Sequence, residues 1–343
     1  MDLFDFEKEL ISRWPLSRWC SVRSVIAVSG GADSVALVSS LARLIPQDQK
    51  CNLLIGHVNH GWRGEASLAD QQFVENLGEQ LEIQCEVLQA KQPVQTEQVA
   101  RDERYRLLLD LAKKTGARYV LMAHHQDDQV ETMIDRIFRG TGLTGLRGIP
   151  KHRELDHGIA LVRPLLDFSR SQIHQYLDQL GAVFCRDDSN QDLKYMRNRI
   201  RQQLLPLIRE QYHEQVDEAI LRIQQMADDL HRVVLEQVEP TLDRYVEVTI
   251  DGNQTEVIVD RTGMAQFDPY LLREMFVSLW KQQNWPRGAM TQQHWQRLED
   301  AVRSSSLTPA FELPGDVRVE LQGERLVLLR RISGGVNSPM TAT

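Results

Sequence analysis

The 343-residue chain contains few cysteines and no long apolar segment. Its cysteines are Cys20, Cys51, Cys85 and Cys185, and none belongs to a Cys-x-x-Cys pair. This spacing argues against a zinc site or a redox pair and is typical of a reducing cytoplasm. No apolar run approaches the roughly 20 residues of a membrane-spanning helix, and the acidic residues 1–5 lack the basic start of a signal peptide. We therefore expect a cytoplasmic protein without a membrane partner.

An excess of positive charge is lacking as well. The formal net charge is −8, so the composition gives no indication of nucleic-acid binding. An RNA ligand would require local basic surface, which the basic residues within 136–153 and 194–201 could provide. The plainer interpretation of such charge runs is a solvated helix face. Hydrophobic residues make up 42% of the chain, enough for a core, and the length suggests two or three domains.

The clearest motif is a glycine turn between an apolar strand and a helix. The β-branched run 25–28 predicts a buried strand, and the apolar spacing of 35–44 predicts a helix. Glycines and a helix N-terminus bring backbone N–H groups close to phosphate oxygens, so the turn suits a phosphate ligand. An acid is unfavourable beside bare phosphate, so we expect Mg²⁺ between them; an ordinary capped turn is the plainer alternative. The turn consists of Ser29, Gly30, Gly31, Ala32, Asp33 and Ser34.

A cluster of acids follows another predicted strand at 118–123. Asp127 and Glu131 are four residues apart and Asp128 and Glu131 are three apart, so a helix would point their carboxylates one way. Like charges repel unless a cation offsets them, and Mg²⁺ carried by ATP phosphates is the cation we expect. Two alternatives are acids that simply favour a helix N-terminus, and a transition-metal site that includes His124 and His125.

Other polar segments are expected at the same edge of the sheet. They follow a second strand at 52–58, line a helix at 96–114, and occupy a glycine-rich loop at 139–148 and a polar turn and helix at 186–201. Ligands of an open parallel sheet bind beyond the carboxyl ends of its strands. Structural histidines and solvated helix faces are the plainer interpretation. The candidate residues are His57, Asn59, His60, Arg63, Arg101, Arg104, Arg139, Asp188, Asn190, Arg197, Arg199 and Arg201.

Taken together, these strings resemble the PP-loop ATP pyrophosphatase superfamily, and within it the tRNA(Ile)-lysidine synthetases. The resemblance covers roughly residues 24–206. It rests on Ser-Gly-Gly-x-Asp-Ser at 29–34, His-x-Asn-His-Gly-x-Arg at 57–63, Ala-His-His-x-Asp-Asp-x-x-Glu-Thr at 123–132, and Asp-Ser-Asn before an Arg-Asn-x-Ile-Arg helix at 188–201. The family implies cleavage of ATP between its α- and β-phosphates. It also implies adenylation of the wobble cytidine in the CAU anticodon of tRNA(Ile), followed by displacement of AMP by the ε-amine of free lysine.

The resemblance implies a role for each candidate. Residues 29–34, with His57 and Asn59, are expected to bind ATP, and Asp33 and Asp127 to hold Mg²⁺. The catalytic set is expected to be Asp33, Asp127, Asp128, His124, His125, Glu131 and Arg104, without a choice of the group that takes the lysine proton. The set expected to contact tRNA or substrate is His60, Arg63, Arg101, Arg139, Asp188, Asn190, Arg197, Arg199 and Arg201. The oligomeric state is not predicted.

The expected fold class is α/β. Residues 1–210 are expected to form the catalytic domain, a parallel doubly wound sheet of about five strands. A linker helix at 211–240 and a small α+β, tRNA-contacting domain at 241–331 would follow, with a disordered tail at 332–343. The sequence Asp251-Gly252-Asn253 between β-branched runs predicts a hairpin, and Pro206 and Pro240 are each expected to end a helix.

Three competing functions share parts of this pattern. A tRNA thiolase would keep the glycine turn, but one that used cysteine pairs would need a Cys-x-x-Cys motif. A small-molecule amide synthetase would have little use for the glycine- and arginine-rich loop at 139–148. A non-catalytic nucleotide-binding module would not need the acids at 127–131.

Overall fold

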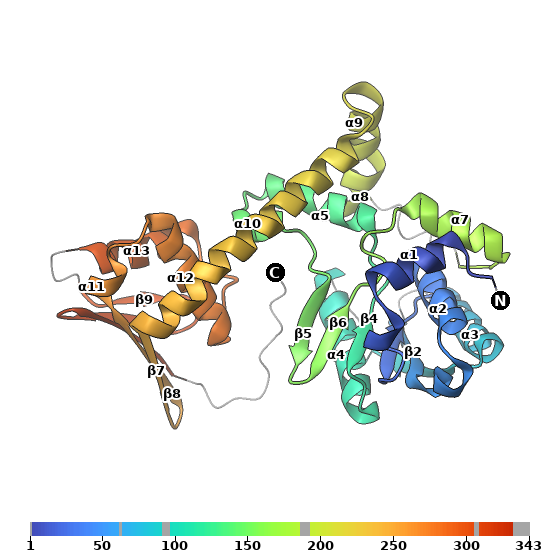
Figure 1. Ribbon diagram of the computed structural model, residues 1–343, viewed down its shortest axis with the longest axis horizontal. Helices are drawn as coiled ribbons and strands as arrows, with labels where there is room; N and C mark the ends of the chain where they lie inside the picture. The colour runs from blue at the N-terminus through green and yellow to red at the C-terminus, as the bar shows by residue number, and fades with distance from the viewer. Residues whose placement is uncertain (1, 62–63, 91–96, 186–192, 305–308, 332–343) are drawn as a thin grey trace. The chain divides into compact units, whose positions relative to one another are not determined.

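The computed structural model describes residues 2–61, 64–90, 97–185, 193–304 and 309–331. Figure 1 shows the course of the chain. The chain divides into two compact units, Met1–Gln225 and Met226–Thr343, which are described separately below. The tail expected at 332–343 lies outside the described residues.

A six-stranded sheet is the centre of the first unit. Its strands are β1 (Ser24–Ala27), β2 (Leu53–Asn59), β3 (Gln84–Gln89), β4 (Tyr119–Leu121), β5 (His152–Asp156) and β6 (Ile159–Val162). The spatial order is β3-β2-β1-β4-β6-β5, and every neighbouring pair is parallel except β5 with β6. The expected parallel α/β sheet is thus confirmed, with β5 as an additional antiparallel edge strand.

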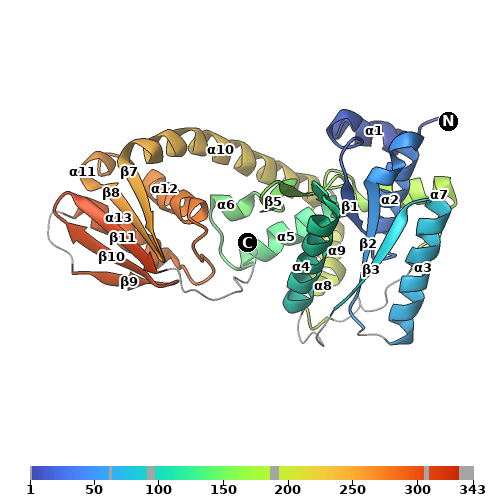
Figure 2. The ribbon, with the colours of Figure 1, turned by 90° about the horizontal axis from the view of Figure 1, so that it is seen from below.

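Helices cover both faces of this sheet (Figure 2). They are α1 (Asp5–Arg13), α2 (Ala32–Leu44), α3 (Glu65–Leu81), α4 (Glu97–Thr115) and α7 (Arg170–Leu180). Two further helices, α5 (Gln126–Phe138) and the short α6 (Leu143–Leu146) that packs on it, follow β4 in the chain. Ile26 of β1 belongs to the core shared with α1, α2, α3 and α7. On the opposite face, an added Cβ on Gly56 would stand 2.9 Å from Leu108 of α4 and 3.1 Å from Val25. Gly56 therefore allows α4 to pack closely on the centre of the sheet.

A second layer of helices follows the sheet in the chain. It contains α8 (Met196–Arg199), a π-helical turn (Ile200–Leu204), α9 (Leu205–Gln211) and the start of α10 (Val216–Tyr245). Ile200 and Leu205 are buried against Val130 and Ile134 of α5. This apolar contact fixes the second layer beside the carboxyl end of β4, where α5 begins.

Both expectations for the prolines were wrong. Pro206 lies in the first turn of α9, where a missing N–H costs no intrahelical hydrogen bond. Pro240 lies inside α10. Val238 and Leu242 on either side of it are buried, and the Thr241 hydroxyl donates to the Gln237 carbonyl at 2.7 Å. Packing and this bond let the helix continue past the proline.

The second unit contains a five-stranded antiparallel sheet in the order β7-β8-β11-β10-β9. The predicted hairpin around residues 251–253 joins its first two strands. The strands are β7 (Val246–Asp251), β8 (Gln254–Asp260), β9 (Phe311–Leu313), β10 (Val317–Gln322) and β11 (Arg325–Arg331). Three helices accompany them, α11 (Arg261–Met264), α12 (Pro269–Gln282) and α13 (Gln292–Arg303). The expected small α+β module is therefore present.

The four cysteines are free thiols. In the part of the chain that the structure describes, no helix combines the length and apolar character needed to cross a membrane.

A buried ion pair holds α1 to the rest of the first unit. The Glu7 side chain is 0% exposed and accepts hydrogen bonds from Arg43 Nε at 2.5 Å, from the Tyr176 hydroxyl at 2.8 Å and from the Phe4 amide at 3.0 Å. These donors come from α2, α7 and the start of α1. The carboxylate therefore joins three elements that cover one face of the sheet.

We expect Arg43→Ala to destabilise the first unit by about 3 kcal/mol, because it removes the cation that pairs with the buried Glu7 carboxylate. Urea denaturation followed by tryptophan fluorescence measures the change. Arg106→Ala is the matched control, since Arg106 forms only exposed ion pairs and its loss should cost about 0.5 kcal/mol. Equal midpoints for the two variants would contradict this account.

Candidate active site

The glycine turn lies between β1 and α2, as expected. Gly30 has a φ of +92°, a conformation that favours glycine, and an added Cβ would stand 3.2 Å from the Cys185 Sγ. The Ser34 hydroxyl donates to the Gly31 carbonyl at 2.8 Å and accepts from the Ser29 amide at 3.2 Å. Ser34 therefore shapes the turn. Ala32 and Asp33 begin α2, so the helix N-terminus faces the turn.

Two residues assigned to ATP binding lie at the end of β2, and one of them supports the turn. His57 is buried, and its Nδ1 lies 2.9 Å from the carbonyl of Val28, the residue before the turn. Burial lowers the pKa of His57, which keeps the ring neutral. Asn59 accepts from the Gly61 amide at 2.8 Å and donates to Gln71 at 3.0 Å. His57 thus positions the backbone before the glycine turn, whereas Asn59 positions the backbone that follows β2.

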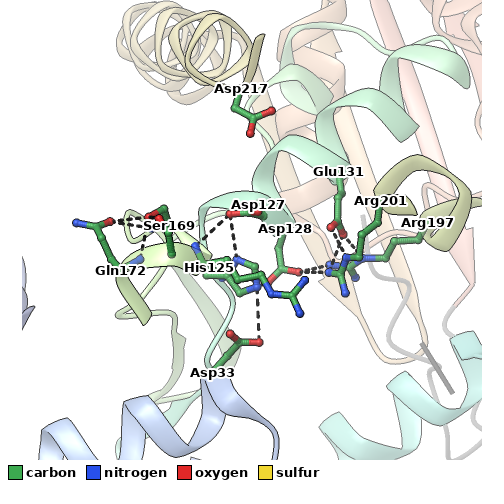
Figure 3. A network of polar contacts seen from close by, with 12 residues as sticks. Asp33, His125, Asp127, Asp128, Glu131, Ser169, Gln172, Arg197, Arg201 and Asp217 are labelled. Carbon is green, nitrogen blue, oxygen red and sulfur yellow. Dashed lines mark hydrogen bonds and ion pairs between the residues drawn. The ribbon is translucent and has the colours of Figure 1, made fainter. Parts of the chain in front are cut away.

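Carboxylates from two separate corners of the sheet meet at His125 (Figure 3). Its Nε2 lies 3.6 Å from Asp33 Oδ2 of α2, and its Nδ1 lies 3.7 Å from Asp127 Oδ1 of α5. Asp128 Oδ2 also lies 3.7 Å from Nε2. The structure therefore brings Asp33 and Asp127 to one imidazole ring, at the carboxyl ends of the neighbouring strands β1 and β4.

The charges at this point perturb one another strongly. Burial alone would lower the pKa of His125, but Asp127, Asp128 and Asp33 together raise it above its ordinary value, which favours the charged form of the ring. Burial raises the pKa of Asp33, although the charge of His125 opposes this shift. The imidazole and the acids therefore stabilise each other's charged forms.

Arginines neutralise Glu131 and the second oxygen of Asp128. Asp128 Oδ1 lies 2.5 Å from Arg197 Nη2 and 3.4 Å from Arg201 Nη2. Glu131 is 2% exposed and lies 2.9 Å from Arg197 Nε and 2.5 Å from Arg201 Nε. The sequence led us to expect Mg²⁺ as the cation that offsets these two acids. In the structure two guanidinium groups from the following helices do so.

Near this network, basic side chains gather on α4 and after β4. Burial, together with the charges of Arg163 and Arg101, lowers the pKa of His124 to about 3. Burial and the charge of Arg104 lower the pKa of His60 to about 4. Both rings are therefore neutral near pH 7, although the charge of Asp128 on His124 and that of Glu103 on His60 act in the opposite direction.

Several candidates lie elsewhere or outside the described residues. Arg139 is exposed at the end of α5 and pairs with Asp135 at 2.9 Å. Arg199 is exposed and donates to the Met196 sulfur at 3.6 Å, so it does not join Arg197 and Arg201. Arg63, Asp188 and Asn190 lie outside the described residues.

Two residues near the site were not among the candidates. Arg163 directly follows β6, and its position at the carboxyl end of a strand was the signal that could have identified it. Gln129 of α5 donates to the Ile149 carbonyl at 2.8 Å and anchors the end of the glycine-rich loop. An added Cβ on Gly148, which has a φ of +66°, would stand 2.3 Å from Gln129 Oε1. Gly148 therefore serves packing of the loop end on α5.

Metal ligands are sparse at this site. Among the residues that the structure describes, no group of three or more His, Cys, Asp or Glu is arranged to hold a metal ion. Mg²⁺ requires fewer protein ligands than that, because it commonly binds one or two carboxylates and substrate phosphates. Asp33 Oδ1 is buried without a hydrogen-bond partner, which leaves a carboxylate oxygen open to such an ion.

The comparisons agree with this geometry. A family described as the PP-loop domain matches residues 14–208. A tRNA(Ile)-lysidine synthase from Rhodopirellula baltica is 33% identical over 86% of this chain and 83% of its own length. Another from Nostoc sp. is 30% identical over 89% of this chain and 91% of its own length. A solved U34-tRNA thiolase from Methanococcus maripaludis shares the fold, with a TM-score of 0.53 and 14% identity over 65% of this chain and 78% of that one.

A glycine turn after the first strand and an acidic corner after the fourth define a PP-loop protein of the ATP-binding type. Within that class, the chain belongs to the tRNA(Ile)-lysidine synthase family. The resemblance found in the sequence is thus confirmed, and the thiolase and amide-synthetase alternatives are not favoured.

We expect Gly30→Ala to weaken ATP binding by about tenfold or more, because the new methyl combines an unfavourable φ with crowding against Cys185. Equilibrium binding of radiolabelled ATP measures the loss. Gly140→Ala is the matched control, since Gly140 has a φ of +72° with no atom within 4 Å of its added Cβ. If both variants bound ATP like the parent chain, the turn would not be the nucleotide site.

Proposed function

We propose that the chain uses ATP to join free L-lysine to C2 of the wobble cytidine in the CAU anticodon of tRNA(Ile), giving lysidine, AMP and pyrophosphate. The proposal rests on membership of the lysidine synthase family and on one observation. That observation is the convergence of Asp33 and Asp127 from two crossover corners, beside a turn suited to phosphate. This is the arrangement that a magnesium-bound triphosphate requires.

The residues present fit Mg²⁺. The unpartnered Asp33 oxygen and the Asp127 carboxylate would hold the ion together with phosphate oxygens. When bound, the ion would neutralise charge on the triphosphate. His125 would then have a cation beside it, and the pKa of its ring would fall.

The chain's own groups would bind and orient ATP. The backbone of the glycine turn and the N-terminus of α2 would face the phosphates. His57 fixes the Val28 carbonyl and thereby the start of this turn. The glycine turn, the neutral His57 that supports it and the Asp33 carboxylate at the start of α2 therefore form one ATP-binding site.

The reaction needs both a better leaving group and a neutral amine. The C2 oxygen of cytosine leaves poorly, whereas the adenylate formed at that oxygen leaves as AMP. The ε-ammonium of lysine has a pKa of about 10.4 and must lose a proton before it attacks. His124 is neutral, and the negative charge of ATP would raise its pKa and make it a stronger base.

The target base must leave its stack to reach this site, at a cost of a few kcal/mol. We assign Arg101, Arg104 and Arg139, with Arg63, to phosphate groups of the anticodon or of departing pyrophosphate. The module at 241–331 is assigned to tRNA contact, and 211–240 to the linker between it and the catalytic domain. The polar segment that includes Asp188 and Asn190 is assigned to the mouth of the site.

We expect Asp33→Ala to reduce formation of the adenylate below detection while tRNA binding stays within about twofold, because phosphate contacts with RNA come from basic groups. Transfer of label from [α-³²P]ATP to tRNA measures the first quantity and filter binding the second. Asp135→Ala is the matched control, since Asp135 pairs with an exposed arginine on the same helix as Asp127. Full turnover by Asp33→Ala would refute the metal role.

Release of AMP and pyrophosphate is expected to require both free lysine and a tRNA with cytidine at the wobble position. Product release from labelled ATP measures this requirement, with uridine at that position as the control substrate. AMP release that needs a sulfur donor, or that proceeds without tRNA, would support one of the other PP-loop reactions instead.

A further inference from the structure

A second group of cations lies near the acidic network, on other elements than the glycine turn. We call it the arginine–tyrosine cluster; it consists of Arg101 and Tyr105 of α4, Arg153 of β5 and Arg163 after β6. The guanidinium carbons of Arg101 and Arg153 lie 5.5 Å and 5.1 Å from the centre of the Tyr105 ring. Arg101 Nη2 also donates to the Tyr105 hydroxyl at 3.4 Å. One buried ring thus organises cations from separate elements.

Arg163 is the most buried member of the cluster. Its residue is 4% exposed, and its Nη1 donates to the Pro150 carbonyl at 2.6 Å. Burial lowers the pKa of Arg163, and the charges of Arg153 and Arg101 act in the same direction, although the Tyr105 hydroxyl opposes them. Desolvation and the charges of Arg153 and Arg101 therefore disfavour the charged form of Arg163.

No acid offsets this charge. In residues 97–185 and the other described ranges, none of the three arginines forms an ion pair with Asp or Glu. The Nε atoms of Arg101, Arg153 and Arg163 are buried without hydrogen-bond partners. Arg197 and Arg201 differ, because each pairs with two carboxylates. Buried cations are normally paired, so the cluster has the composition of an anion site rather than of a structural ion pair.

The cluster lies at the ligand-binding edge of the sheet. Arg163 follows β6 and His124 follows β4, and these two strands are parallel neighbours. The charges of Arg163 and Arg101 act on the His124 ring, whose Nδ1 is also buried without a partner. An anion held by the arginines would therefore lie beside a neutral histidine at the carboxyl ends of the strands.

We propose that the arginine–tyrosine cluster is an oxyanion subsite for a substrate, separate from the glycine turn that faces ATP. Planar guanidinium groups suit an oxyanion because they donate two parallel hydrogen bonds to it. The inference rests on the proposed function, which offers two sources of such a group. One is a phosphodiester of the tRNA backbone, and the other is the α-carboxylate of free lysine.

Two substitutions test the subsite, Arg153→Gln and Arg163→Gln. Arg153 lies on the edge strand β5 and is half-buried, so its loss should leave the fold intact even if the Arg163 variant unfolds. Arg106→Gln is the matched control, because Arg106 lies on α4 and pairs with Glu103 and Asp110 at the surface. The measurements are the Kd for tRNA over a range of salt and the Kd for lysine by equilibrium dialysis, with lysine amide as competitor.

The outcomes separate the two sources. If the ligand is an RNA phosphate, the Kd for tRNA should rise about tenfold and its salt dependence should fall by about one counterion, while the Kd for lysine is unchanged. If the ligand is the lysine carboxylate, the Kd for lysine should rise about tenfold and the preference over lysine amide should shrink, while tRNA binding is unchanged. Either result supports an oxyanion subsite.

The proposal is overturned if the Arg153 variant binds both tRNA and lysine as Arg106→Gln does. These are equilibrium measurements and do not depend on turnover. A parent chain that releases AMP only with lysine and tRNA, alongside unchanged binding by the variant, would reject the subsite and leave the proposed function standing. A parent chain without that activity would reject the proposed function, whatever the variants bind.

Discussion

Repulsion among carboxylates is the constraint on which the site depends. Asp33, Asp127, Asp128 and Glu131 approach one another at the ends of β1 and β4, and such a group is unstable without positive charge. The structure supplies it from two sides. The His125 ring, whose pKa is raised by the acids, lies between the first three of them, and Arg197 and Arg201 face Asp128 and Glu131. Asp33 and Asp127 are thus open to a metal ion, whereas Asp128 and Glu131 are already neutralised by the arginines.

This division links the site to the later part of the first unit. The two arginines lie on α8 and the π-helical turn, whose Ile200, with Leu205, packs on α5. The apolar contact and the ion pairs therefore fix the same helices from two directions. Breaking either would leave Glu131 buried without sufficient positive charge, which costs several kcal/mol. Formation of the acidic corner consequently requires the chain well beyond the sheet to be folded.

Much of this arrangement could be predicted from local pattern. The β-branched run before Gly30 and the periodicity after it specify a strand, a turn and a helix, and strand order then brings Asp33 and Asp127 to one edge. What local pattern could not provide were the long-range partners. No sequence signal connects Arg201 with Glu131, 70 residues apart, or marks Arg153 as part of a strand, because β5 is polar and bonds only to β6. The prediction that Pro240 ends a helix was wrong for the same reason. Burial of the neighbouring residues Val238 and Leu242 outweighs the cost of a proline inside the helix.

The central claim is that Asp33 and Asp127 jointly hold a divalent ion on the triphosphate. Binding of Mn²⁺ in the presence of a non-hydrolysable ATP analogue, followed by the EPR signal of the free ion, tests it most directly. The account predicts one tightly bound ion in the parent chain and a Kd at least about tenfold higher in both Asp33→Asn and Asp127→Asn. Unchanged affinity for Mn²⁺ in both variants would contradict it.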